Sequence, residues 1–283
     1  KTMSGFAIYN YNFLRIIRPN EEYQLEFPDW VKVNVQESFE NRQQLLEELL
    51  LADFEKPFPF ENARKKPYWH KQIVKPQDNV YVMRVANVTN VTITDEHLLS
   101  QKYADYRNCL VIIDNRPGIQ RIAIEQKTMA FSHTKTVANI LEASFCKLLK
   151  CKLLKVKLSA VYGTNVFWET LGKYPKGFSK VTFHFPHLNL DRLTKVMDKY
   201  LTTAREDWDS DLDFTFGANE GGAVKIDRNN QRQTALIAGA SSAGAWIKML
   251  PKGEKGKAIL CGKDQYVVRE LDSEVFNDLA IGA

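Results

Sequence analysis

The sequence contains few cysteines, and they are not densely spaced. The four cysteines stand at positions 109, 146, 151 and 261 and form no C-x-x-C pair. A disulfide-stapled scaffold needs a much denser cysteine framework, so the spacing excludes that class. The sequence therefore predicts reduced thiols that pack as small buried hydrophobic residues, as in a cytoplasmic protein.

Long apolar runs are also missing. No window approaches 18 consecutive apolar residues, and Asn10, Asn12 and Arg15 interrupt the N-terminal stretch. A helix that spans a bilayer needs about 20 apolar residues, so we expect no membrane partner. Motifs for nucleotide phosphates are missing too, since the sequence has no Walker loop and no G-x-G-x-x-G after a predicted strand. The small-residue tract 235–245 does not form a G-x-S-x-G nucleophile elbow, because Gly244 lies three residues after Ser241.

The chain is long enough to bury a substantial core. It has 283 residues, of which 44% are hydrophobic, enough for one large domain or two modest ones. Hydrophobic periodicity predicts an α+β fold, with mixed or antiparallel sheets built from hairpins and several packed helices. Strands are expected over 6–17, 79–94, 109–113, 119–124, 153–162, 180–185, 212–216, 223–227, 246–250, 258–261 and 266–271. Helices are expected over 37–54, from Ser132 or Thr134 to about Lys150, before Gly172, and over 190–204.

Two features of this pattern predict the domain organisation. Residues 56–71 carry three prolines, which favours a linker, so we predict domains over 1–78 and 79–283, with a sub-boundary near residue 175. Residues 180–228 read strand, helix, strand, strand, which predicts a β-α-β-β run like half of a split βαβ layer. Residues 95–106 predict a short helix or an irregular connection.

Charge is segregated by sign along the chain, although the net charge is only +5. Between Ala143 and Trp168 there are five lysines and no acidic residue. We predict that the helix ending near Lys150 is followed by a strand whose lysines point outward, and that Arg121 and Lys127 lie near this surface. Such a surface can bind nucleic acid, because each lysine can neutralise a phosphate. The alternative is a solvated face that protects a strand edge from aggregation.

Basic and aromatic residues also alternate around residues 64–71. Single-stranded nucleic acid sites combine these residue types, because bases stack on rings while Lys and Arg contact phosphates. The alternative is a solvated loop anchored by Tyr68 and Trp69. The candidate nucleic-acid-binding residues are Arg64, Lys65, Lys66, Trp69, Lys71, Arg121, Lys127, Lys147, Lys150, Lys152, Lys155 and Lys157.

The stretch Cys109–Lys127 predicts a β-hairpin with a turn over Asp114–Gly118. An Asp before the turn, followed by Glu125-x-Lys127 on the return strand, resembles the metal site of restriction-endonuclease-like nucleases. The resemblance implies a Mg²⁺-dependent nuclease. In a regular hairpin Asp114 would face about Ile119, roughly 20 Å from Glu125, so it cannot share a metal with it and instead suits a turn cap. Glu125 would face about Asn108, which favours Asp105 as its partner and gives Asp105, Glu125 and Lys127 as the candidate catalytic residues.

Two further clusters have simpler explanations. His184 and His187 lack a third metal ligand at a familiar spacing, and the acidic run over 206–213 lacks the glycine and terminal Glu of an EF-hand. That run could meet the lysine-rich segment of a second copy and form a homo-oligomer.

Three functions remain open at this point. The leading hypothesis is a non-catalytic nucleic-acid-binding protein without a cofactor. The alternatives are the Mg²⁺-dependent nuclease and a protein-interaction subunit.

Overall fold

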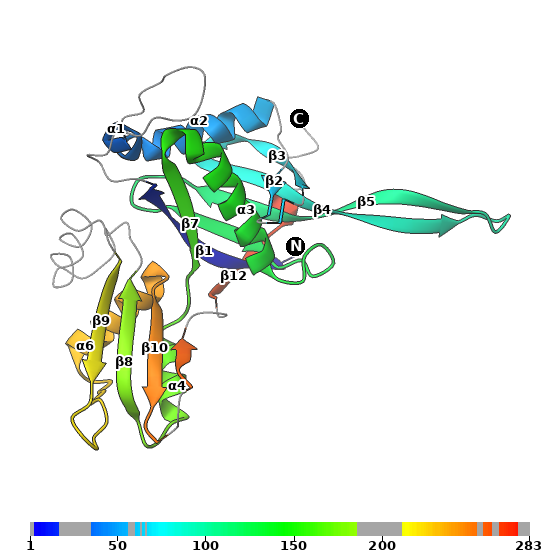
Figure 1. Cartoon of the computed structure of the whole chain (residues 1–283). Helices are drawn as coiled ribbons and strands as arrows, with labels where there is room; N and C mark the ends of the chain where they lie inside the picture. Colours follow the sequence, from blue (N-terminus) through cyan, green and yellow to red (C-terminus); the bar gives the residue numbers. More distant parts are fainter. Residues whose placement is uncertain are drawn as a thin grey trace. The chain divides into compact units, whose positions relative to one another are not determined.

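The structure of the protein is a computed structural model that describes residues 3–16, 35–55, 60–62, 64–65, 67–185, 211–253, 257–261 and 266–276 (Figure 1). Helices and antiparallel sheets are both present, which confirms the mixed α+β class. The chain forms two compact units, each described by itself below. Unit 1 comprises residues 1–7, 13–158 and 268–283, and unit 2 comprises residues 8–12 and 159–267. No helix within the described ranges is both long and apolar enough to cross a membrane.

Unit 1 is built on a large antiparallel sheet. The strands of this sheet are β1 (Met3–Arg15), β2 (Phe60–Glu61), β3 (Pro67–Gln77), β4 (Val80–Thr94), β5 (Ser100–Asp114), β6 (Arg121–Glu125), β7 (Leu154–Ala160) and β12 (Val268–Asp272). Residues 8–12 of β1 and 159–160 of β7 are assigned to unit 2. Their order is β12-β1-β6-β5-β4-β3-β2, and β7 pairs with β1 beside this path. The helices are α1 (Val35–Glu40), α2 (Arg42–Glu55) and α3 (Thr134–Leu149), with a short 3₁₀ helix over Lys150–Lys152 after α3.

One face of this sheet carries α3. Phe145 of α3 meets Phe60 edge to face, Phe60 stacks on His70, and His70 lies opposite Val85 of β4. Because side chains alternate along a strand, Tyr81 and Met83 point to the same face as Val85, and all three are buried. We call this the helix face of the sheet.

The opposite face carries a smaller core of Phe6, Ile73, Val82 and Leu110, against which Phe276 packs. Arg84 shares this face, since it is two residues from Val82 and lies opposite Leu110. We call it the second face. The two faces together show that this sheet is buried by different segments of the chain on its two sides.

The β4–β5 hairpin is the longest element and extends beyond the other strands of the sheet (Figure 1). Its register runs without a break from Val80↔Asp114 to Thr94↔Ser100. β3 pairs with β4 only as far as Ala86, and β6 pairs with β5 only as far as Val111, so the distal half is a two-stranded ribbon. The prediction of a helix or irregular segment over 95–106 is therefore wrong from Ser100 onward, because both faces of this ribbon are exposed and leave no burial pattern in the sequence.

The proline-rich segment 56–71 also differs from its prediction, because it contains strands. The linker expected over 56–71 contains β2 and the start of β3, and the predicted boundary at residue 78 falls inside the β3–β4 hairpin. Pro67 is the first residue of β3, where its missing N–H is tolerated. The predicted sub-boundary near 175 lies within unit 2, which begins its main segment at residue 159.

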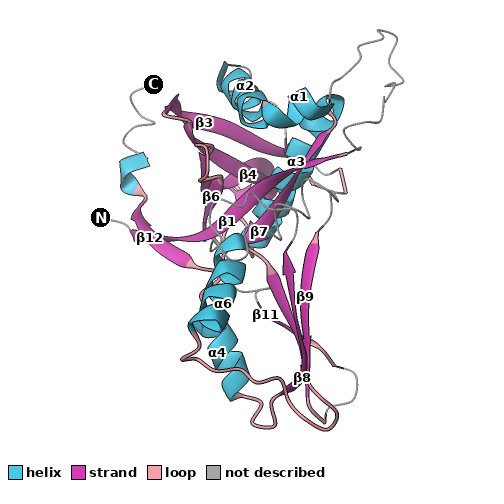
Figure 2. Ribbon diagram, turned by 90° about the vertical axis from the view of Figure 1, so that its left-hand side faces the viewer, coloured by secondary structure: helices cyan, strands magenta, loops and turns pink. Residues whose placement is uncertain are grey.

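Unit 2 is a four-stranded antiparallel sheet in the order β11-β10-β8-β9. These strands are β8 (Phe178–Phe185), β9 (Leu212–Gly217), β10 (Trp246–Pro251) and β11 (Ile259–Cys261). The helices α4 (Asn165–Gly172) and α6 (Gln231–Ala243) bury residues against it, and α6 contacts β8 and β10 (Figure 2). The small residues of 235–245 thus serve helix packing, as their size predicts.

Only part of the β-α-β-β prediction is present in unit 2. β8 and β9 are paired as neighbours, whereas the helix expected over 190–204 lies outside the described residues. Residues 223–227 do not form a strand, although the N–H of Val224 donates to the carbonyl of Phe178 at 2.8 Å. This bond continues no ladder, and Val224 and Ile226 also pack against the core of unit 2.

Candidate functional site

The β5–β6 turn confirms the structural role of Asp114. Its carboxylate accepts hydrogen bonds from the backbone N–H of Arg116 at 3.2 Å and from the Arg116 side chain at 2.6 and 2.9 Å. The turn is longer than the sequence suggested, so Asp114 lies opposite Arg121 and not Ile119. This shift of two residues changes every partner on the return strand.

The shift separates the candidate catalytic residues. Val111 pairs with Ile124, so Glu125 lies beside Leu110, whereas Asp105 lies opposite Thr89 and forms an ion pair with Arg107 at 2.8 Å. Asp105 is therefore five residues further along β5, about 17 Å away, and points to the other face of the sheet. The structure does not assemble Asp105 with Glu125 and Lys127, and the described residues contain no cluster of three metal-ligating side chains.

Glu125 and Lys127 instead line a polar pocket on the second face of unit 1. The cavity measures about 290 Å³. It is lined by Ser4, Arg84, Leu110, Glu125, Gln126, Lys127, Ser273 and Glu274. We call it the Glu125 pocket. Two basic and two acidic side chains surround it, and Leu110 is its one apolar lining residue.

The end of β6 shapes this pocket. Beyond Glu125 the chain leaves β5 and the N–H of Gln126 donates to the carbonyl of Gly5 on β1 at 2.8 Å. A Cβ at position 5 would lie 2.7 Å from Oε1 of Gln126, so glycine at this position lets the glutamine side chain lie against β1. Ser4 and Ser273 join β1 to the chain after β12 through a hydroxyl contact of 3.1 Å.

Glu125 is the most buried charged group of the pocket. Only 7% of the residue is exposed, and its Oε2 accepts a hydrogen bond from the N–H of Leu110 at 2.9 Å. Within the described ranges, no donor reaches its other oxygen, Oε1, and no carboxylate lies within ion-pair distance of Lys127. Of the four charged side chains of the pocket, Glu125 and Lys127 therefore do not form an ion pair with each other.

The charges of the pocket also reach the neighbouring thiol. Burial, with a smaller contribution from the Glu125 carboxylate, raises the pKa of Cys109 to about 12, against the opposing effects of Lys127 and Arg84. Cys109 and Cys261 are buried as expected, but Cys151 is exposed, so the prediction of four buried thiols is wrong at that position. All four are free thiols.

The lysine-rich surface is the second candidate site. We define it by the exposed residues Lys147, Lys150, Lys152, Lys155 and Lys157. α3 ends at Leu149 and β7 begins at Leu154, which confirms the predicted change of period, and Leu153 makes the turn with a φ of 56°. On β7 Leu154, Val156 and Leu158 are buried, so the lysines between them point outward.

Two of these lysines are already paired. Lys147 contacts Glu61 at 2.9 Å and Lys157 contacts Glu142 at 2.9 Å. Lys150, Lys152 and Lys155 form no ion pair with any residue that the structure describes. The three therefore provide the available positive charge of this surface.

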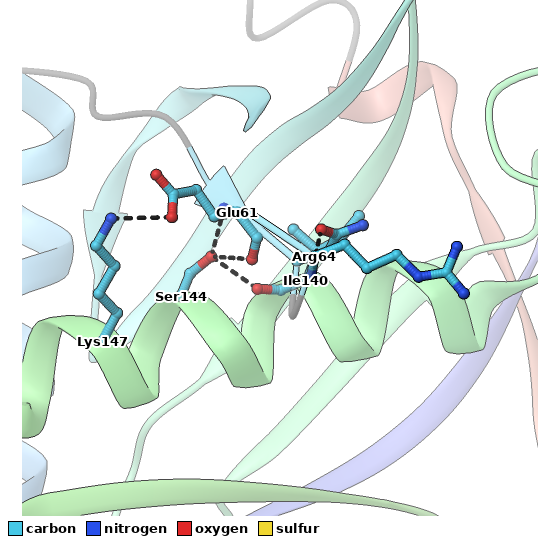
Figure 3. A network of polar contacts seen from close by, with 6 residues as sticks. Glu61, Arg64, Ile140, Ser144 and Lys147 are labelled. Atoms are coloured by element: carbon cyan, nitrogen blue, oxygen red, sulfur yellow. Dashed lines mark hydrogen bonds and ion pairs between the residues drawn. The ribbon is translucent and has the colours of Figure 1, made fainter. Parts of the chain in front are cut away.

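A hydrogen-bond network joins β2 to α3 (Figure 3). The hydroxyl of Ser144 accepts from the N–H of Glu61 at 3.0 Å, and the carbonyls of Glu61 and Ile140 lie within hydrogen-bond distance of it at 3.2 and 2.7 Å. The turn that follows carries Arg64 and Lys65, both exposed. Lys147 and Arg64 lie on opposite sides of this network in Figure 3, and the Arg64 side chain extends away from Lys147.

The remaining predicted nucleic-acid contacts are not on the lysine-rich surface. Trp69 and Lys71 lie opposite Ala86 and Arg84, on the second face of the sheet, where Trp69 meets Tyr106 edge to face. Arg121 shares that face because Ala123, two residues later, packs into its core. Lys127 lines the Glu125 pocket, and Lys66 lies outside the described residues. Alternation along the strands thus separates residues that are close in sequence.

His184 has partners that explain it without a metal. Its Nδ1 lies 2.6 Å from Asp213, its Nε2 lies 3.6 Å from Asp211, and its ring stacks on Trp246. His187, Asp207 and Asp209 lie outside the described residues.

Comparison of the sequence with protein families and curated proteins identifies no relative. No protein-family model matches the chain, and no curated protein matches it in sequence.

Proposed function

We propose that this protein binds nucleic acid through the lysine-rich surface of unit 1. The proposal is carried by one observation. Lys150, Lys152 and Lys155 are exposed, and none forms an ion pair with a described residue. A surface lysine without a carboxylate partner can release the counterions of a phosphate backbone without first breaking an ion pair.

The spacing of the lysines suits a phosphate backbone. Alternate residues of a strand, such as Lys155 and Lys157, lie about 6.7 Å apart. The phosphates of one strand rise by only about 3.4 Å each along the axis of a duplex, but they also turn about it, so the direct distance between consecutive phosphates is larger than this rise and close to the lysine spacing. Lys157 is the last of these lysines in sequence, and its ion pair with Glu142 holds its side chain in place.

Arg64 and Lys65 lie on the turn after β2, which the Ser144 network holds to α3, and Arg64 extends away from Lys147 (Figure 3), so we do not count them as part of the lysine-rich surface. Trp69 points to the second face of the sheet and is not part of it. The proposed binding therefore depends on phosphate contacts without base stacking, and we expect little sequence preference.

The test is binding of fluorescent single-stranded and duplex DNA and RNA at low and moderate salt. We expect salt-sensitive binding that weakens in the triple variant Lys150→Ala, Lys152→Ala, Lys155→Ala. A matched control replaces Lys173, Lys176 and Lys180, three exposed lysines of unit 2, by alanine and so changes the net charge equally.

Two results would contradict the proposal. One is the absence of salt-sensitive binding to any of these nucleic acids at low salt. The other is an equal loss of affinity in the triple variant and in its control, since the lysine-rich surface would then have no special role.

A further inference from the structure

The Glu125 pocket contains a buried carboxylate with unused hydrogen-bonding capacity. Burying a charged group is costly unless it is paired, and Glu125 is 7% exposed. Its Oε2 accepts from the N–H of Leu110, while Oε1 has no donor in the described part of the chain and lies in a residue that lines the cavity. The pocket therefore offers an acceptor that suits an N–H group of a ligand.

Two positive groups, Arg84 and Lys127, line the same cavity, which also has the exposed carboxylate of Glu274 in its lining. Arg84 enters from β4, where its Nη1 donates to the side chain of Asn108 at 2.7 Å, and Lys127 lies two residues after Glu125. No carboxylate among the described residues forms an ion pair with Lys127. Lysine and arginine side chains in this arrangement suit a phosphate group.

The size of the cavity limits the ligand. Its volume of about 290 Å³ is at the lower end of the range for small-molecule sites. A cavity of this size can hold one nucleotide but not a stretch of oligonucleotide. The polar lining, with Leu110 as its one apolar member, suits a ligand that is charged at one end and hydrogen-bonding at the other.

We propose that the Glu125 pocket binds a nucleoside monophosphate whose base carries an exocyclic amino group. The amino group donates to Oε1 of Glu125, and the phosphate lies against Lys127 and Arg84. A carboxylate that accepts from an amino group discriminates against a base that presents a carbonyl in its place. This proposal does not depend on nucleic-acid binding by the lysine-rich surface.

Cytidine and uridine monophosphate provide a matched pair of probes, because they differ at this position by an amino group against a carbonyl. We expect calorimetric titration to give at least about tenfold tighter binding of cytidine monophosphate, the effect of one charge-assisted hydrogen bond. Glu125→Gln should remove this preference, since an amide can donate to the carbonyl as well as accept from the amino group. It keeps an acceptor for the N–H of Leu110, and thermal melting checks that it folds.

Lys127→Met gives an independent measurement at an exposed position. It should weaken binding of cytidine monophosphate several-fold and leave binding of cytidine unchanged. The triple variant of Lys150, Lys152 and Lys155 should bind cytidine monophosphate like the wild-type protein, so failure of this proposal can be distinguished from failure of the proposed function.

Four results would overturn the proposal. They are no binding of either nucleotide at millimolar concentration, equal binding of inorganic phosphate and cytidine monophosphate, tighter binding of a free amino acid than of a nucleotide, and a preference for cytidine monophosphate that survives Glu125→Gln. The second result would indicate an anion site, and the third a site for a zwitterion.

Discussion

The triple replacement of Lys150, Lys152 and Lys155 by alanine makes a quantitative prediction about salt. Each phosphate contact on duplex DNA contributes about 0.9 to the slope of log affinity against log salt. If each of these lysines makes one contact, the variant slope is smaller by about 2.7. Between about 50 and about 200 mM salt, a fourfold change, the wild-type protein should then lose about 40-fold more affinity than the variant.

The two paired lysines sharpen this prediction. Lys147 and Lys157 each contact a glutamate at 2.9 Å, so a phosphate must compete with that carboxylate. Replacing both by alanine should therefore change the slope by less than about 1, although two charges are removed. Fluorescence anisotropy at five salt concentrations measures both slopes. Equal slopes for the wild-type protein and the triple variant would refute the reasoning, and a larger effect of the paired lysines would show that ion pairs do not limit the contacts.

Three further predictions concern stability and thiol chemistry. Ser144→Ala leaves an N–H and a carbonyl of β2 without their hydroxyl partner, so urea denaturation should show a loss of about 1–3 kcal/mol. Gly244→Ala should lower the free energy of unfolding by about 1–3 kcal/mol, because φ is +73° and the added Cβ would lie 2.6 Å from a side-chain carbon of β7. Gly172→Ala, with open space around it, should have little effect, and equal effects of the two changes would contradict this account. At about pH 8 a disulfide reagent should modify exposed Cys151 rapidly and Cys109 only after unfolding, since burial raises the pKa of Cys109 from 9.0 to about 12. This shift stabilises the fold below pH 9, and the stability should be lost as the pH rises toward 12.

Local elements could be predicted where one side of the element is buried. The end of α3 and the start of β7 were predicted within a few residues, because Lys155 and Lys157 alternate with buried leucine and valine. The ribbon of β4 and β5 beyond Ala86 has no buried side, so residues 100–106 carried no periodicity. The start of β3 was predicted as part of a linker because it contains proline and basic residues. Proline is tolerated at the first position of a strand, and the sequence does not show that Pro67 occupies that position.

The candidate site was less predictable because it depends on register. An error of two residues in the β5–β6 turn moved Glu125 from Asn108 to Leu110 and removed Asp105 as its partner. The pocket that Glu125 does line also takes residues from β1, β4 and the segment after β12. No local sequence pattern connects such distant segments. The hypotheses of a homo-oligomer and of a protein-interaction subunit stay predictions.

The pairing of β1 with β12 has a consequence for folding. Met3 lies opposite Asp272, and the hydroxyls of Ser4 and Ser273 are separated by 269 residues of chain. Contacts of such high sequence separation form slowly, and during synthesis they must wait until the last of these residues has emerged from the ribosome. The Glu125 pocket, which both serines line, therefore forms late in folding. Binding of a ligand there would show that β12 has paired with β1.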